Sequence, residues 1–137
     1  MSNWSRAKVT FKKMDSALLS DALKAMGYYP NFNDKKVDGS YSFDGSRECD
    51  CVLYDINTDQ TSNIGLSFTT DKDGNIDIKV IGDWYNKTYN DKTFTQALTL
   101  EYSTANMIKQ ARENGYMVQE TEMLEEYKRR VVFVKAA

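Results

Sequence analysis

The first regular pattern in the chain is an alternation of polar and apolar residues. Between residues 6 and 11, the apolar Ala7, Val9 and Phe11 interleave with basic and polar residues. This period of two is typical of a β-strand with one buried face. The sequence therefore predicts a first strand at this position.

A short amphipathic helix is predicted next. Asp15 or Ser16 is placed to cap it, and Gly27 is placed to end it in a left-handed conformation. Its apolar residues share one face of a helix: Leu18, Leu19, Ala22, Leu23 and Met26. We expect that face to pack on a sheet.

The middle of the chain is predicted to be mainly strand. Residues 28–50 mix aromatic residues with Asp, Asn, Gly and Ser and contain Pro30, so we expect a loop and then a weak strand around residues 36–43. β-Branched and aromatic residues favour better strands further on, at residues 51–56, 64–70 and 76–85. Asp73-Gly74 is a strong hairpin signal and joins the last two of these strands.

A longer helix follows the strands. Its apolar residues again recur at helical spacing: Phe94, Leu98, Tyr102, Ala105, Ile108 and Ala111. Thr93 or Asp91 is placed to cap it and Gly115 to end it, which gives a helix of about 20 residues.

A closing hairpin completes the pattern, because residues 116–123 and 127–134 are both strand-like and a short turn separates them. The order is then β-α-β-β-β-β-α-β-β. Closely spaced strands pair antiparallel, and two amphipathic helices suffice to cover one face of a sheet. We therefore expect one α+β domain over residues 1–137, a two-layer sandwich with both helices on one face of a mainly antiparallel sheet.

Composition narrows the classes of function. The chain has 137 residues and no histidine, which excludes Ser-His-Asp and Cys-His sites, histidine general bases and histidine metal ligands. It also lacks a Gly-rich phosphate loop, a Walker motif and a dinucleotide fingerprint. We predict no catalytic residue, no metal site and no other cofactor. Carboxylate catalysis stays open as an alternative, with Asp55 and Asp83 as its candidates.

The sequence predicts a cytoplasmic protein without membrane contact. No run approaches the roughly 18 apolar residues of a membrane span, and no apolar core of a signal peptide follows the N-terminus. Cys49 and Cys51 are too close for an ordinary disulfide and too few for a structural zinc site. We expect both thiols on one face of the start of a strand, buried or half-buried and inert, in a reducing compartment.

Residues 71–77 have the oxygen density of a calcium-binding loop without its register. Counting from Asp71, an EF-hand needs glycine at its sixth position and glutamate at its twelfth, where this chain has Ile76 and Gly82. A solvated hairpin turn is predicted instead.

Charge is distributed unevenly along the chain. The net charge is only −2, but residues 31–77 hold ten acidic residues against four basic ones. Basic residues gather on the first and last strands and would form one stripe if those strands were neighbours. Such a stripe suits a phosphate backbone, with Tyr127 or Trp4 available to stack on a base. The candidates for this nucleic-acid contact are Arg6, Lys8, Lys12, Lys128 and Arg130.

The closing hairpin offers a different explanation for its own basic residues. If it turns about Glu125, Glu122 lies opposite Lys128 and Glu120 lies opposite Arg130. Cross-strand pairs of opposite charge would then neutralise the last strand.

Three motifs are similar to those of a known family. Met-Ser-Asn-Trp-Ser-Arg-Ala-Lys at residues 1–8 resembles a Met-Ser-His-Phe-Ser start, and Asp83-Trp84-Tyr85 resembles an Asp-Trp-aromatic motif. Residues 100–116 resemble a Gln-x-Tyr helix that ends in Gly-Phe or Gly-Tyr. These motifs belong to the hypothetical chloroplast open-reading-frame proteins, a domain of unknown function found in plastids, cyanobacteria, other bacteria and phages. The resemblance implies the same fold order and supplies no reaction.

That resemblance also implies candidate contact residues. Asn3 stands where the family has histidine, so a role for that imidazole does not transfer to this chain. Surface use is implied for Trp4, Asp83, Trp84 and Tyr85, and Trp and Tyr are favoured anchors of protein interfaces.

The leading hypothesis is a non-catalytic protein that binds a protein partner or itself, as an accessory factor or a phage-encoded factor that contacts a host component. Nucleic-acid binding through the basic terminal strands is the alternative.

Overall fold

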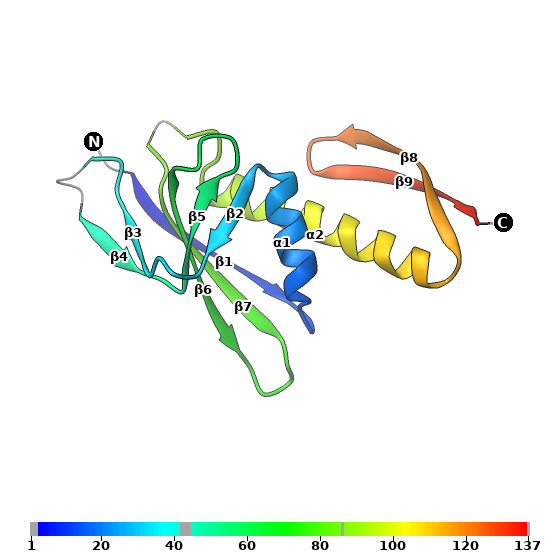
Figure 1. Ribbon diagram of the computed structural model, residues 1–137, viewed down its shortest axis with the longest axis horizontal. Coiled ribbons are helices and arrows are strands. Elements are labelled where there is room, and N and C mark those ends of the chain that lie inside the picture. The colour runs from blue at the N-terminus through cyan, green and yellow to red at the C-terminus, as the bar shows by residue number, and fades with distance from the viewer. Residues whose placement is uncertain (1–2, 42–44, 86, 137) are drawn as a thin grey trace.

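The computed structural model describes residues 3–41, 45–85 and 87–136. Its elements are β1 (Trp4–Phe11), α1 (Ser16–Ala25), β2 (Tyr28–Asn31), β3 (Lys36–Asp38), β4 (Ser46–Glu48), β5 (Cys51–Asp55), β6 (Thr61–Thr70), β7 (Ile76–Asp83), α2 (Asp91–Glu113), β8 (Tyr116–Glu125) and β9 (Lys128–Lys135). Five strands form an antiparallel sheet in the order β1-β7-β6-β5-β2. The pairs β3-β4 and β8-β9 form two further sheets (Figure 1). The predicted α+β fold and its order are confirmed.

The region between the first helix and β5 is more regular than the sequence indicated. We expected a loop and one weak strand over residues 36–43, and the chain instead forms β2, β3 and β4. Among the described strands, β2 pairs only with β5 and is an edge strand. An edge position tolerates Pro30, which has no backbone N–H to donate. Tertiary pairing therefore overrides weak local propensity here.

Both helices begin at side-chain caps. Asp15 caps α1 as predicted, since its Oδ1 accepts from the backbone N–H groups of Ala17 and Leu18 at 2.9 and 3.4 Å. The predicted caps of α2, Thr93 or Asp91, were both wrong, because Asn90 is the cap and Thr93 is its partner in a capping box.

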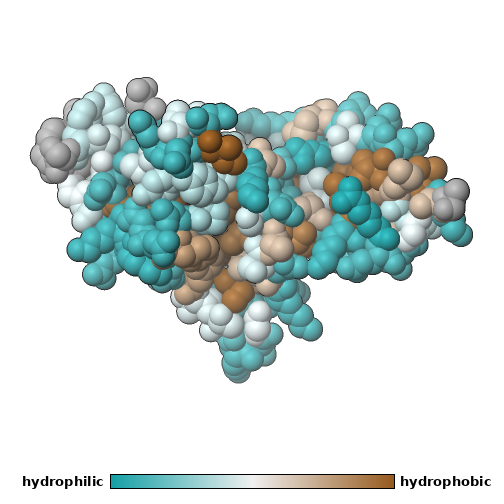
Figure 2. Space-filling model, viewed as in Figure 1, coloured by the Kyte–Doolittle hydropathy of each residue, from teal (hydrophilic) through white to brown (hydrophobic). Residues whose placement is uncertain are grey.

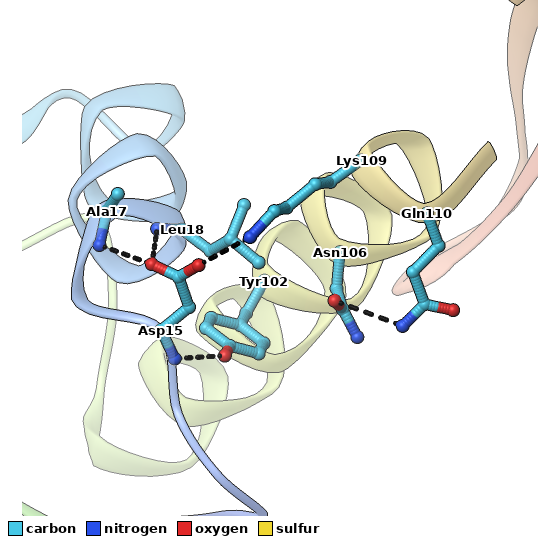
Figure 3. A network of polar contacts seen from close by, with 7 residues as sticks. All are labelled: Asp15, Ala17, Leu18, Tyr102, Asn106, Lys109 and Gln110. Atoms are coloured by element: carbon cyan, nitrogen blue, oxygen red, sulfur yellow. Dashed lines mark hydrogen bonds and ion pairs between the residues drawn. The ribbon is translucent and has the colours of Figure 1, made fainter. Parts of the chain in front are cut away.

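The start of α1 is tied to α2 by the same capping residue. The backbone N–H of Asp15 donates to the Tyr102 hydroxyl at 2.9 Å, and Lys109 Nζ lies 2.8 Å from Asp15 Oδ2 (Figure 3). These contacts fix how the two helices cross on the sheet.

The main core lies between the helices and one face of the five-stranded sheet. Most of the apolar residues predicted for the two helices pack there, and Ile108 and Ala111 of α2 are only half-buried. Leu23 of α1 and Phe94 of α2 are fully buried. The strands contribute Phe11, Cys51, Leu53, Ile64, Leu66, Ile78 and Val80.

The β3-β4 hairpin covers part of the opposite face of the sheet. Val37, Cys49 and Val52 form a small buried cluster there. Gly65 permits this approach, because a Cβ at that position would lie 2.9 Å from Cys49 Sγ. Cys49 lies in this cluster and Cys51 in the main core, so the expectation that both thiols share one face was wrong: the chain turns between them at Asp50.

The β8-β9 hairpin packs on α2, away from the five-stranded sheet (Figure 1). Within the described residues, β9 pairs only with β8 and β1 pairs only with β7. The first and last strands are therefore not neighbours in a sheet, and the continuous basic stripe that depended on such pairing does not form.

Replacing Leu23 with alanine tests the main core. We expect Leu23→Ala to lower the free energy of unfolding by about 2–5 kcal/mol, because the side chain is fully buried and leaves a cavity. Ile56→Ala serves as the control, since Ile56 is 44% exposed and should change stability by less than about 0.5 kcal/mol. Urea unfolding followed by circular dichroism measures both, and equal effects would contradict this description of the core.

Candidate functional site

Asp83, one of the predicted contact residues, is a buried structural anchor at the end of β7. Its side chain has 0% exposure. Oδ1 accepts from the backbone N–H groups of Asn3 at 2.7 Å and Tyr85 at 3.2 Å, and Oδ2 accepts from that of Ser40 at 2.8 Å. One carboxylate thus holds together the chain before β1, the segment after β3 and the segment after β7.

Two opposing influences set the pKa of Asp83. Burial is the largest single influence and would raise it, but the hydrogen bonds from three backbone N–H groups together outweigh burial and lower the pKa below 3.8. The carboxylate is therefore charged at neutral pH and saturated by the backbone. This arrangement supports the fold and leaves Asp83 unsuited to a proton-transfer role.

Trp84 is also part of the fold. It is 4% exposed and belongs to the main core, with its ring centroid 5.8 Å from that of Phe94. Its indole N–H donates to the backbone oxygen of Ser5 at 3.3 Å. A partner protein has little of this side chain to contact.

The two other predicted contact residues lie nearer the surface. Trp4 is half-buried against the cluster under the β3-β4 hairpin, and the Arg47 guanidinium carbon lies 4.5 Å from the centroid of its ring. Tyr85 is 39% exposed, and its ring centroid is 5.8 Å from that of Tyr41. The motif Asp83-Trp84-Tyr85 therefore divides between core and surface, and Tyr85 is its exposed member.

The predicted nucleic-acid residues are exposed but divide between two regions. Arg6 and Lys8 lie on β1, Lys12 directly follows it, and Lys128 and Arg130 lie on β9. Lys8 and Lys128 line the same groove, which runs between β1, α2 and the turn of the last hairpin. The other three are not among its lining residues.

Arg130 already has carboxylate partners within its own hairpin. One of its terminal nitrogens, Nη2, lies 2.6 Å from Glu122 Oε2 and 3.6 Å from Glu120 Oε1. The predicted cross-strand neutralisation is confirmed for Arg130, but the predicted register was wrong. Glu122 lies opposite Arg130 and Glu125 opposite Lys128, because the turn falls at residues 126–127 and two irregularities shift the pairing.

The same hairpin carries an exposed apolar surface that the sequence analysis missed. Figure 2 shows hydrophobic residues gathered at the C-terminal end of the molecule. Five large apolar side chains of β8 and β9 are at least 42% exposed: Tyr116, Met117, Met123, Leu124 and Val134. The signal was the run of four apolar residues at positions 131–134, since such a run is typical of a strand buried on both faces.

An ion pair anchors the inner face of the hairpin on α2. Arg129 Nη2 lies 2.7 Å from Glu101 Oε1, and Nη1 lies 3.2 Å from Glu101 Oε2 and from Thr104 Oγ1. The two charged side chains are only 19% and 20% exposed. This bidentate geometry is the strong form of the Arg-carboxylate pair.

The remaining candidate chemistry has structural explanations. Asp71 accepts from the backbone N–H groups of Asp73 and Asn75, as a hairpin turn requires, and the described residues contain no cluster of three or more Cys, Asp or Glu side chains that is suited to a metal ion.

Burial, followed by nearby negative groups, raises the pKa of Cys49 to about 11 and that of Cys51 to about 12. Both thiols therefore stay protonated at neutral pH.

Comparison with known proteins places the chain in a family. The family described as a protein of unknown function, DUF1257, matches residues 22–132. The chain belongs to the DUF1257 family. The matched segment begins within α1 and ends within β9. It contains strands β2 to β7, α2 and most of the last hairpin, and β1 lies before it. No curated protein and no solved structure matches the chain. Among the described helices, none has the length and apolar character to cross a membrane.

Asp83→Asn tests the anchor at the end of β7. We expect this variant to lower the free energy of unfolding by about 1–3 kcal/mol at neutral pH. The amide keeps the size of the side chain but lacks the negative charge that accepts hydrogen bonds from three backbone N–H groups. The folded-state pKa is lowered, so this stabilisation is present above pH 3.8 and disappears as the pH falls through the folded-state pKa. The difference in free energy of unfolding between wild type and variant should therefore become smaller in acid. Urea unfolding across pH measures it, with the exposed Asp21→Asn as control.

Glu101→Gln tests the anchor of the hairpin. We expect Glu101→Gln to lower the free energy of local unfolding of the β8-β9 hairpin by about 1.5–3 kcal/mol, because a neutral amide replaces the carboxylate of a charge-assisted pair. Backbone amide hydrogen exchange should accelerate in β8 and β9 and stay unchanged in β6 and β7. Glu125→Gln is the matched control, since that carboxylate is 69% exposed and 3.6 Å from Lys128. An unchanged exchange rate in Glu101→Gln would show that packing alone holds the hairpin.

Proposed function

We propose that the chain acts by protein contact, as a non-catalytic domain whose copies associate through the outer face of the β8-β9 hairpin. The observation that carries this proposal is the run Val131-Val132-Phe133-Val134. It has the composition of a strand covered on both faces, while α2 covers only one.

The register of the hairpin defines the two faces. Arg129 contacts α2, and alternation along the strand places Val131 and Phe133 on the same inner face. Val132 and Val134 therefore lie on the outer face. Val134 pairs with Met117, and these two side chains are 44% and 52% exposed.

An isolated two-stranded ribbon gains little stability from its own pairing, and packing on a further element is needed. α2 supplies that packing on the inner face only. A second chain on the outer face would bury the apolar side chains that remain exposed there, which stabilises both copies.

Charge complementarity favours a second copy of this chain as the partner. On the outer face, β8 carries Glu120, Glu122 and Glu125, and β9 carries Lys128 and Arg130. A two-fold axis parallel to the strands places β8 of one copy over β9 of the other, so that acidic residues meet basic ones. The hairpin surface is thus complementary to itself.

Further aspects of this proposal rest on the sequence. A cytoplasmic role as an accessory factor, and the resemblance to proteins of plastids, cyanobacteria and phages, remain part of the proposal. The nucleic-acid alternative has less support, because Glu120 and Glu122 already pair with Arg130 and the middle of the chain is acidic.

The double variant Met117→Glu, Val134→Glu tests self-association. Wild type is expected to have the mass of two chains at high concentration in size-exclusion chromatography with light scattering. The variant should have the mass of one chain, because burying two unpaired carboxylates raises the dissociation constant by at least about a hundredfold.

Ile56→Glu is the matched control, since Ile56 is also 44% exposed but lies outside the hairpin. It should associate like wild type, and unchanged circular dichroism spectra should show that all the variants fold. Self-association is ruled out as the function of this face if wild type has the mass of one chain up to its solubility limit.

A further inference from the structure

A groove with a volume of about 610 Å³ runs between β1, α2 and the turn of the β8-β9 hairpin. Lys8 and Val9 of β1 both line it, and successive residues of a strand point to opposite faces of a sheet. A groove that contacts both residues therefore lies along the edge of β1. The opposite wall is α2, which contributes the polar Thr95, Gln96, Thr99, Ser103 and Thr104 and the apolar Leu100 and Met107.

The backbone at this edge of β1 has no strand partner among the described residues. The N–H of Trp84 donates to the backbone oxygen of Asn3 at 3.0 Å, so the odd-numbered residues of β1 face β7. Antiparallel pairing alternates, which turns the N–H and C=O groups of Arg6, Lys8 and Thr10 toward the open edge. Such an edge is a template for one more strand.

The charge of the groove is positive. Lys8, Lys128 and Arg129 line it, and none of its lining residues is acidic. Arg129 is neutralised by Glu101, but the lysine side chains are 58% and 65% exposed, and their nearest carboxylate oxygens lie at 3.9 and 3.6 Å. Pairs this exposed and this long leave most of the positive potential available to a ligand.

A lysine on an edge strand often serves only to prevent aggregation. That explanation accounts for Lys8 and does not account for Lys128, which a different element brings to the same groove. Two cations from separate elements, a helix wall with both polar and apolar side chains, and an open strand edge together describe a binding site.

We propose that this groove binds an extended acidic segment of another protein, which adds to β1 as a further strand of the main sheet. Its backbone pairs with Arg6, Lys8 and Thr10, and its acidic side chains meet Lys8 and Lys128. Main-chain pairing gives affinity in this mode, and alternate side chains give specificity. A single-stranded nucleic acid fits less well, because Tyr127 is the one aromatic residue among those that line the groove and stacking platforms use several.

The test uses a fluorescein-labelled synthetic peptide of alternating Glu and Val and the full chain, followed by fluorescence anisotropy. Lys128→Glu should weaken binding by about tenfold or more, and Lys24→Glu, an exposed change on α1, should leave it unchanged. A peptide of alternating Lys and Val should not bind. Absence of binding by the Glu peptide, or equal binding by both peptides, would overturn the proposal.

Two variants at one position separate charge from backbone pairing. Lys8→Gln removes the charge and keeps the N–H, whereas Lys8→Pro removes both, and proline is tolerated where an edge N–H faces outward. The proline variant should bind several-fold more weakly than the glutamine variant. Equal affinities would rule out pairing at this residue.

Hydrogen exchange gives a readout that does not depend on a variant folding. Peptide binding should slow exchange at the N–H groups of Arg6, Lys8 and Thr10. Slowing at the free edges of β8 or β9 instead would overturn the site. Tighter binding of an oligo-dT strand than of the Glu peptide would assign the groove to nucleic acid.

The groove does not depend on the proposed self-association. The same titration on Met117→Glu, Val134→Glu keeps the two proposals separable. Binding to this variant with unchanged affinity supports the groove even if the chain proves monomeric, and a loss of binding would show that the site requires the dimer and would overturn the proposal as stated.

Discussion

The ion pair between Glu101 and Arg129 determines where the β8-β9 hairpin lies. A hairpin that follows a helix has several faces on which to pack. In this pair each terminal nitrogen of Arg129 donates to a different carboxylate oxygen of Glu101, which selects the face of α2 that carries Thr104. Both charges are largely shielded from water, so an incorrect placement of the hairpin would leave a desolvated charge unpaired. The groove beside β1 and the exposed face of the hairpin both follow from this placement.

Much of the fold was predictable because periodicity reports burial directly. The strand β1 and both helices were predicted from apolar spacing, and they bury most of the faces that the spacing indicated. The closing hairpin was predicted from its strand-like composition, and many of its apolar side chains are exposed. Gly27 and Gly115 follow the two helices with φ values of 95° and 84°, as their sequence positions indicated. The short strands β2 to β4 were not predictable in this way, because their pairing partners, and not their own residues, make them strands.

The candidate contact residues show why surface and core are hard to distinguish in a motif. Asp83 is charged, and charge usually indicates exposure, yet three backbone N–H groups from separate segments make burial favourable. The sequence around Asp83 does not indicate that the N–H groups of Asn3 and Ser40, 80 and 43 positions away along the chain, donate to it. The register of the hairpin failed for a related reason, since its two irregularities depend on packing. In contrast, the apolar run at residues 131–134 is visible in the sequence. The sequence does not show that α2 packs on one face of this strand and leaves the other face exposed.

In this DUF1257 member, the open edge of β1 and the exposed outer face of the β8-β9 hairpin have one structural origin. Had β9 paired with β1, the main sheet would have gained a strand, the open edge of β1 would have disappeared and the hairpin would have been covered. Instead Lys8 and Lys128 approach one groove from separate sheets, with α2 between β1 and the hairpin. The anchor on Glu101 therefore stabilises an arrangement that leaves strand edges and an apolar face exposed, which a chain without partners has reason to avoid. Occupation of these surfaces by other chains gives that arrangement a physical rationale.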